Sequence, residues 1–398
     1  MARILFTWEL GGGLGHTLSH RALMEALITD GHEIWFAMRN LEQAAKLFEG
    51  IEVHCIQAPR NIPDTNNPYE TISSYAHLLH NVIFHSIDSI KKTTKEWQQI
   101  FARISPDVLI ADHSPGALFA SRGLPLIRTQ IGTGFTIAPN SIEPMPNLRN
   151  WLEVDKKILL EEEKQVLGRL NKVAMDINIP VLPYLAELYK ADRQYLMTFS
   201  ELDHITKRNS DEYYGITISG FGEDPLWPEV KGKKIFAYLK PFKTITSLLS
   251  TLKTSGLPTL IYYAGKITKD IKGFECESLK IVENTLNISK VAPQCDVAIT
   301  HAGHGTATEL LLAGCPLLLL PLNLEQYMFA ERVSAMGAGL SAPLLKPEGM
   351  AGKLHLLLSD PAYKLAANAF SSKYSDCDNK KIIADIVEDI NSTLKENK

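Results

Sequence analysis

The sequence predicts an α/β protein with two domains, each built on a doubly wound parallel sheet. Short apolar runs alternate with longer segments of helical periodicity, first over residues 4–130 and again over residues 234–321. Residues 220–232, between the two series, are rich in glycine and proline. A chain of 398 residues is also long for one hydrophobic core. We therefore expect an N-terminal domain over residues 1–219, a linker over 220–232, a second domain over 233–379 and a C-terminal helix over 380–398.

The elements of the first domain follow from its apolar runs and turn residues. Near-continuous apolar runs are typical of buried parallel strands, and they predict strands at 4–8, 33–38, 51–56, 106–112 and 126–130. Residues 195–198 and 216–219 are weaker strand candidates. Helical periodicity predicts helices at 17–29, where Gly31 follows the last turn, at 41–48 and over most of 69–104.

The second domain repeats this alternation. Strands are expected at 234–239, 260–263, 279–282, 296–300 and 316–321. The C-terminal segment carries apolar residues at helical spacing, which predicts an amphipathic helix that packs back on the protein. Asp376 and Asp378 lie just before that helix, where capping is a more natural role than metal binding.

The composition narrows the class of protein. A net charge of −4 without a dense basic run argues against nucleic acid as a partner. The five cysteines are scattered and form no CxxC pair, which argues against a zinc site or a disulfide framework and favours a cytoplasmic location. We expect no signal peptide, because the N-terminal apolar run is too short and leads directly into glycines. We also expect no transmembrane segment, because the longest apolar stretch, 310–322, is short and is interrupted by glycine and proline. The oligomeric state is left open by the sequence.

Polar residues of the second domain fall where strands are expected to end and helices to begin. His301 follows one predicted strand, Gly303 and Gly305 allow a close approach to the backbone, and Thr306 adds a hydroxyl. A helix N-terminus at the carboxyl edge of an α/β sheet favours an anion, so a nucleoside diphosphate is the ligand we propose. Glu309, about one helical turn further on, suits a ribose diol because a carboxylate accepts from both hydroxyls.

This run resembles the donor signature of inverting, nucleotide-sugar-dependent glycosyltransferases of the GT-B fold, most closely the UDP-glycosyltransferase group. The pattern H-x-G-x-x-[ST]-x-x-E, then G-x-P, then P-x-x-x-[DE]-Q is matched without a gap from His301 to Gln326. The resemblance implies two Rossmann-like domains that face a cleft. It also implies which residues contact the donor. The diphosphate would be bound by His301, Gly303, Gly305 and Thr306, and the ribose by Glu309. The sugar would be bound by Glu325 and Gln326, and the base by Pro293 and Gln294.

The sequence departs from the family pattern at two places. Plant members carry a tryptophan that stacks on uracil, and no tryptophan lies in this region, so the donor is UDP- or dTDP-linked. Lys240 follows the first strand of this domain, where small hydroxyl residues are more usual. Lys240 is either a phosphate contact or a solvated lysine.

The acceptor side is expected in the first domain. Gly15 and His16 end a glycine loop after the first strand, and Asp112 ends a later strand of the same sheet. They resemble the family's catalytic histidine and its aspartate partner, which implies that His16 is the general base and Asp112 orients it. Phe84 and Phe135 are further acceptor candidates, and residues 62–84 are expected to form either an acceptor wall or ordinary helix core.

The resemblance implies single displacement with inversion, in which a hexose-type sugar moves to a hydroxyl of a small-molecule or lipid-like acceptor. The nucleotide sugar is then a co-substrate, and neither a metal nor a cofactor is expected. Three alternatives remain open. They are a nucleotide-sugar epimerase on the same fold, a non-catalytic nucleotide-sugar binder, and an NADP- or flavin-binding oxidoreductase that uses the loop at Gly11–Gly15.

Overall fold

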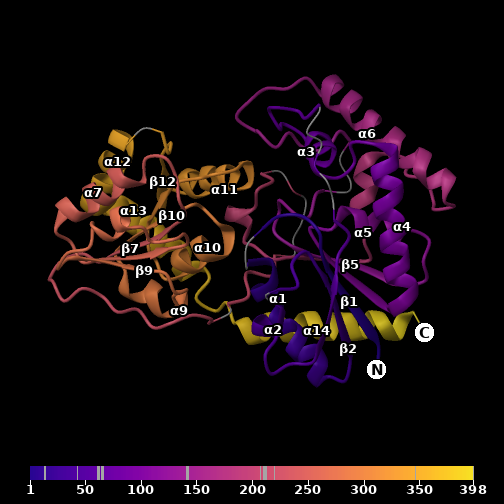
Figure 1. The fold of residues 1–398 in the computed structure, drawn as a ribbon, viewed down its shortest axis with the longest axis horizontal. Coiled ribbons are helices and arrows are strands. Elements are labelled where there is room, and N and C mark those ends of the chain that lie inside the picture. Colours follow the sequence, from indigo (N-terminus) through magenta and orange to yellow (C-terminus); the bar gives the residue numbers. More distant parts are fainter. Residues whose placement is uncertain are drawn as a thin grey trace. The chain divides into compact units, whose positions relative to one another are not determined.

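A computed structural model describes the chain at residues 1–12, 15–42, 44–60, 63, 67–139, 143–206, 208, 213–218, 220–345 and 347–397, without the side chains at 15, 16, 45, 46, 347 and 348. The chain forms two compact units (Figure 1). Unit 1 holds Met1–Phe199, Ile205–Thr217 and Asp378–Lys398, and unit 2 holds Ser200–His204 and Ile218–Cys377. The short segment Ser200–His204 thus belongs to unit 2, although it lies within the range expected for the first domain.

Unit 1 is built on a six-stranded parallel sheet in the order β3-β2-β1-β4-β5-β6. Its strands are β1 (Arg3–Trp8), β2 (Glu33–Met38), β3 (Val53–Gln57), β4 (Val108–Asp112), β5 (Ile127–Gly132) and β6 (Arg193–Leu196). All five strands predicted for this domain are present, and the apolar side chains of β1, β2, β4 and β5 fill the core, whereas the edge strand β3 is only half-buried. Residues 216–218 are not a strand, and Ser219 lies outside the described residues.

Helices cover this sheet, and they differ from the predicted helices at two places. The helices are α1 (Gly15–Thr29), α2 (Ala44–Leu47), α3 (Tyr75–Val82), α4 (Ile87–Ile104), α5 (Pro115–Ala120), α6 (Lys156–Asp176) and the 3₁₀ helix η1 (Leu185–Tyr189). The helical stretch expected over 69–104 is two helices, because Ser86 caps a new one by accepting from Ser89 N at 3.2 Å. Helix α6 was not predicted. It buries a stripe that includes Leu159, Val166 and Leu170 beneath a largely charged surface.

Unit 2 repeats the topology of unit 1. Its parallel sheet has the order β12-β11-β10-β7-β8-β9, which is the same strand order when strands are counted within the unit. The strands are β7 (Ile235–Leu239), β8 (Thr259–Tyr263), β9 (Leu279–Val282), β10 (Val297–Thr300), β11 (Leu317–Leu319) and β12 (Gly339–Ser341). The helical elements are η2 (Ser200–Leu202), α7 (Ile245–Ser255), α8 (Lys269–Lys272), α9 (Ile288–Val291), η3 (Ala292–Gln294), α10 (His304–Leu312), α11 (Leu324–Ala335), α12 (Pro347–Ser359) and α13 (Pro361–Lys373). The expected fold class, two Rossmann-like α/β domains, is confirmed.

The C-terminal helix α14 (Asn379–Glu396) packs on unit 1, where it lies beside α1 (Figure 1). Asp378 caps it by accepting from Lys380 N at 2.9 Å, as the sequence predicted. Ile386 and Ile390 are buried, and Asp389 accepts hydrogen bonds from Arg193 Nε at 3.0 Å and Tyr195 Oη at 2.7 Å. The C-terminal segment therefore returns to unit 1 and completes its packing. Among the described residues, no helix is long and apolar enough to cross a bilayer.

The burial of Ile386 predicts that Ile386→Ala destabilises unit 1. The side chain is fully buried, so its truncation leaves a cavity that costs about 2–5 kcal/mol. Chemical denaturation followed by circular dichroism measures this loss in the free energy of unfolding. Ile158→Ala, at a helical position of the same unit that is 54% exposed, is the matched control and is expected to change stability by less than about 0.5 kcal/mol. Equal effects of the two substitutions would show that α14 does not stabilise unit 1.

Candidate functional site

The predicted site residues lie at the same topological position in both units. In each sheet the chain reverses its winding between the first and fourth strands, which are β1 and β4 in unit 1 and β7 and β10 in unit 2. Ligands of open α/β sheets bind at the carboxyl ends of strands at this point. Asp112 is the last residue of β4, in register with Trp8 of β1, and His301 directly follows β10. Asp112 and His301 are therefore structural counterparts.

The residue after each of them has a strained backbone. His113 has φ 44° and Ala302 has φ 59°, a left-handed conformation that non-glycine residues rarely adopt. Hydrogen bonds hold both turns, since Leu10 N donates to His113 O at 3.0 Å and Ala302 N donates to Thr300 Oγ1 at 3.1 Å. Strain of this kind is concentrated at functional sites, where surrounding structure maintains it.

The ring of His301 is engaged at both nitrogens. Lys240 N donates to Nε2 at 2.8 Å, so this nitrogen carries no proton, and Nδ1–H donates to Leu320 O at 2.7 Å. Burial, and secondarily the charge of Lys240, lowers the pKa of His301, which keeps the ring neutral. In this arrangement the only N–H of the His301 ring is used within the protein, so a contact between this ring and a donor phosphate stays a prediction. His301 instead joins the ends of β7, β10 and β11.

The sequence predicts an anion site at the N-terminus of α10, and the structure leaves the backbone there accessible. Gly303 is the N-cap and Gly305 is the second helical residue, and both are exposed. A Cβ atom built on either glycine meets nothing within 4 Å, and neither glycine has a positive φ. Neither packing nor backbone conformation therefore requires glycine here. Small residues at this position leave room for a ligand to approach the backbone amides, and half-buried Thr306 adds its hydroxyl.

His304, which was not among the predicted site residues, fixes this helix terminus. Its ring is buried between Phe329 of α11, edge-on with ring centroids 5.1 Å apart, and His204, stacked with centroids 5.8 Å apart. Burial lowers the pKa of His304 to about 3. The signal available in the sequence was a histidine between two glycines of the donor pattern, but only packing shows that it points into the core.

Glu309, Pro293 and Gln294 are brought together by the packing of α9 and η3 on α10. Ser289 Oγ of α9 donates to Glu309 Oε1 at 2.6 Å. Burial raises the pKa of Glu309, and this hydrogen bond opposes the rise. Gln294 Nε2 donates to Lys290 O at 2.7 Å. The carboxylate expected to bind ribose is thus hydrogen-bonded to α9, the helix that directly precedes the loop expected to bind the base.

Glu325 and Gln326 lie in the first turn of α11, whose N-cap Asn323 accepts from Gln326 N at 3.0 Å. Gln326 Oε1 accepts from Leu322 N at 2.8 Å, which leaves the Nε2 amide group as the donor end of this side chain. The ammonium group of Lys240 makes no hydrogen bond or ion pair that the structure records with another described residue, and its side chain is half-buried. Both groups remain suited to a ligand.

In unit 1, Asp112 pairs with His20, a histidine that was not among the predicted site residues. His20 Nε2 lies 2.8 Å from Asp112 Oδ2, and both side chains are about 5% exposed or less. His16 lies in the first turn of α1, one helical turn before His20, and Gly15 begins that helix. The His16 side chain lies outside the described residues, so its pairing with Asp112 stays a prediction. An i, i+4 histidine on the same helix face is the signal that would have indicated His20.

The expected acceptor residues Phe84 and Phe135 are both buried but lie in different surroundings. Phe84 is 1% exposed and packs edge-on against Phe119 with centroids 6.3 Å apart, so it belongs to the core and offers no surface to an acceptor. Tyr75 is equally buried, which favours the helix-core interpretation for this part of residues 62–84. Phe135 lies in the turn after β5 and meets His113 edge-on at 5.8 Å. Phe135 therefore borders the strained turn beside Asp112.

A second buried acid at the carboxyl edge of the unit 1 sheet, Glu9, was also not predicted. Glu9 follows β1 and is 2% exposed, and its carboxylate accepts from Trp97 Nε1 at 3.0 Å and from Gly116 N at 2.7 Å. A Cβ atom on Gly116 would clash with this carboxylate, so a side chain at this position would displace Glu9 from its hydrogen bonds. Glu9 thereby fixes the start of α5 beside β4. Within the described ranges, no three metal-ligating side chains cluster.

The buried ring of His304 predicts a pH dependence of stability. The unfolded chain takes up a proton on this histidine below about pH 6.5, but the native ring stays neutral until about pH 3. The native state therefore loses stability as the pH falls through this window, by roughly 2 kcal/mol between pH 7 and 5. Urea unfolding at both pH values is expected to show a smaller loss for His304→Phe. His355→Phe, at an exposed position of unit 2, is the control. An unchanged pH dependence in His304→Phe would contradict a neutral buried ring.

Known proteins resemble this chain at the level of one domain and of the whole fold. Residues 262–386 match the glycosyltransferase family 28 C-terminal domain. The sterol 3-beta-glucosyltransferase of Vanderwaltozyma polyspora is 32% identical over 75 residues, which are 19% of this chain. The matched segments span only 6% of that protein and 9% of a second sterol 3-beta-glucosyltransferase, from Saccharomyces cerevisiae.

Two solved structures are similar over nearly the whole chain. The calicheamicin glycosyltransferase CalG4 has a TM-score of 0.71 at 15% identity, with coverage of 99% of this chain and 98% of that one. The glycosyltransferase VinC in complex with dTDP has a TM-score of 0.63 at 15% identity, with coverage of 97% and 99%. The strand orders, the donor pattern and these matches agree. The chain therefore has the GT-B fold of nucleotide-sugar glycosyltransferases, and its residues 262–386 form a glycosyltransferase family 28 C-terminal domain.

Proposed function

We propose that this protein transfers a hexose-type sugar from a UDP- or dTDP-sugar to a hydroxyl group of a small-molecule or lipid-like acceptor. The observation that carries the proposal is the open N-terminus of α10, with two exposed glycines that the protein's own packing does not require. It lies inside the family 28 domain and at the switch point of its sheet. The related proteins named above support the substrate classes, since one acts on a sterol and another was solved with dTDP.

In this proposal, backbone amides at the start of α10 bind the diphosphate. The helix dipole and the hydroxyl of Thr306 add to the attraction, and Lys240 supplies a positive charge from the end of β7. Glu309 accepts from the ribose hydroxyls, next to the loop that holds Pro293 and Gln294. Gln326 Nε2 and Glu325 contact the sugar. As the glycosidic bond breaks, negative charge develops on the diphosphate, and the oriented amides stabilise it without reorganisation.

The proposed chemical step is a single displacement with inversion. The acceptor oxygen forms a bond to the anomeric carbon, the bond from that carbon to the diphosphate oxygen breaks with its electron pair, and the acceptor proton passes to His16. Asp112 orients His16 and stabilises the imidazolium that forms. We assign Asp112 Oδ1 to His16, since Oδ2 is held by His20. His20 is a positioning residue, because its buried ring fixes the carboxylate without contacting the acceptor.

The base assignment predicts that His16→Ala lowers the turnover number by roughly 10²–10⁴. Nucleoside diphosphate affinity is expected to stay within about twofold, because unit 2 supplies the donor contacts. Steady-state transfer assays with UDP- and dTDP-sugars measure the first quantity, and titration calorimetry measures the second. His355→Ala is the control and is expected to keep full turnover. Full turnover in His16→Ala would refute the base assignment, and isomerised sugar released without any acceptor would favour the epimerase alternative.

The space around Gly305 predicts that Gly305→Leu separates binding from stability. A leucine there meets no protein atom at Cβ but blocks the approach to the helix amides. The melting temperature is expected to stay the same or rise, because leucine favours a helix over glycine. The affinity for UDP or dTDP is expected to fall by more than roughly tenfold, since hydrogen bonds to charged groups are lost.

Gly352→Leu, at an open position of α12, is the matched control for this binding measurement. It makes the same chemical change on another helix of unit 2. Nucleotide affinity is expected to be that of the wild type. Undiminished binding by Gly305→Leu would place the diphosphate elsewhere.

A further inference from the structure

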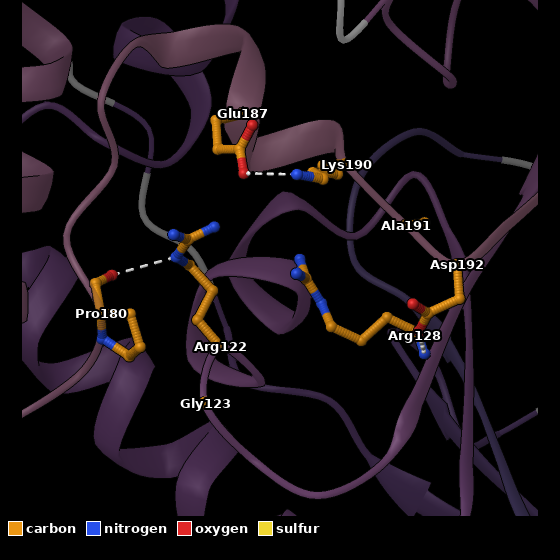
Figure 2. A pocket seen from close by; sticks show the side chains of 8 residues that line it. All are labelled: Arg122, Gly123, Arg128, Pro180, Glu187, Lys190, Ala191 and Asp192. Atoms are coloured by element: carbon orange, nitrogen blue, oxygen red, sulfur yellow. Dashed lines mark hydrogen bonds and ion pairs between the residues drawn. The ribbon is translucent and has the colours of Figure 1, made fainter. Parts of the chain in front are cut away.

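Unit 1 contains a polar pocket that the proposed reaction does not use. It encloses about 260 Å³ between the turn after α5 and the segment from η1 to β6 (Figure 2). It is lined by Arg122, Gly123, Arg128, Pro180, Glu187, Lys190, Ala191 and Asp192. This volume suits a small ion or metabolite and is below the range of sites for larger organic ligands.

The pocket lies near the amino-terminal ends of its strands. Arg128 is the second residue of β5, and Asp192 directly precedes β6. Arg128 is in register with Leu109 of β4, three residues before Asp112, or about 10 Å along the strand. The pocket is therefore distinct from the switch point, where Asp112 and the strained turn at His113 lie.

Positive charge dominates the pocket. Figure 2 shows that the guanidinium groups of Arg122 and Arg128 and the ammonium group of Lys190 point toward the same space. Of the two acids, Glu187 is paired with Lys190 at 3.4 Å, and the Asp192 carboxylate accepts from the backbone N of Arg128 at 2.8 Å. Among the described residues, no carboxylate lies within 4.0 Å of either guanidinium group. Three cations thus face two carboxylates, which leaves a net positive charge.

The two arginines also keep most of their hydrogen-bond donors unused. Arg122 donates from Nε to Pro180 O and from Nη2 to Val181 O, each at 3.0 Å. Arg128 donates from Nη2 to Leu118 O at 3.1 Å, and its buried Nε has no partner among the described atoms. Each guanidinium has five N–H donors, so three of ten have a recorded acceptor. A buried N–H without an acceptor costs free energy that a bound anion can recover.

The electrostatics support the same conclusion. Burial, and secondarily the nearby charge of Arg122, lowers the pKa of Arg128 to about 10. Burial also lowers the pKa of Arg122. Both directions show that the protein stabilises these two cations less well than water does, although both stay charged at neutral pH.

We infer that this pocket binds a small tetrahedral oxyanion, either inorganic phosphate or the phosphate group of a small phosphorylated metabolite. Guanidinium forks match two oxygens of such a group, and Lys190 adds a point charge at the rim. The site is separate from the proposed donor site in unit 2, so the inference does not depend on the proposed function.

The test titrates the full chain with inorganic phosphate and follows assigned backbone amide resonances. Gly123 and Ala191 report on the pocket, and Gly303 and Gly305 report on the start of α10. Saturable shifts of the two pocket resonances are expected, in the presence and in the absence of saturating UDP. Shifts confined to Gly303 and Gly305, or no saturable shift, would overturn the inference. A parallel titration with glucose 6-phosphate identifies the source, because the tighter of the two probes is the closer match to the natural ligand.

Variants assign the binding to the cations. Lys190→Met changes a side chain that is 67% exposed, so the fold is expected to persist, and phosphate affinity is expected to fall by roughly tenfold. Arg122→Lys keeps the charge but removes the fork and is expected to weaken binding as well. Lys172→Met, at an exposed position of α6, is the matched control and is expected to bind as the wild type does. Unchanged affinity in both pocket variants would show that the shifts arise elsewhere.

Discussion

The imidazole ring of His301 joins three strand ends of unit 2, and the start of α10, where we propose that the diphosphate binds, depends on that junction. The ring accepts from Lys240 N after β7 and donates to Leu320 O after β11, while its own backbone continues β10. Both bonds can exist together only for the neutral ring with its proton on Nδ1, which burial favours. The left-handed turn at Ala302 then directs the chain into α10. The histidine of the donor pattern therefore fixes the strand ends from which α10 begins, and its own ring N–H is used within the protein.

The two units have the same strand order but use different groups at the switch point. Unit 2 places a neutral ring there, with the exposed, glycine-rich start of α10 beyond it, and this combination suits an anion. Unit 1 places carboxylates there, with Asp112 bound to His20 and Glu9 bound to Trp97 and Gly116. A buried carboxylate beside an imidazole ring suits proton transfer. The division between donor binding and base catalysis in our proposal follows from this chemical difference on a shared topology.

Much of the fold was predictable, because buried parallel strands are apolar along their whole length and leave a clear trace in the sequence. Helix α6 was missed since its apolar stripe is interleaved with charged residues such as Glu161, and the break between α3 and α4 depends on the single cap Ser86. Phe84 was expected at a ligand surface and lies in the core, because an aromatic residue has the same appearance in either place. His20 and His304 were missed because their roles depend on partners that lie 92 and 25 residues away.

The sequence by itself determined the two-domain α/β class, most strand positions and the order of polar residues along the donor pattern. Periodicity and motif spacing are local properties of the chain, so they can be read without coordinates. Only the tertiary structure decided that the proton of His301 is used within the protein, that Asp112 is held by His20, and that α14 belongs to the first unit. It also brought Arg122 and Arg128 to one pocket with Lys190. These features depend on burial and on contacts between distant segments, and such contacts fix hydrogen-bond partners and protonation states that residue identity alone leaves open.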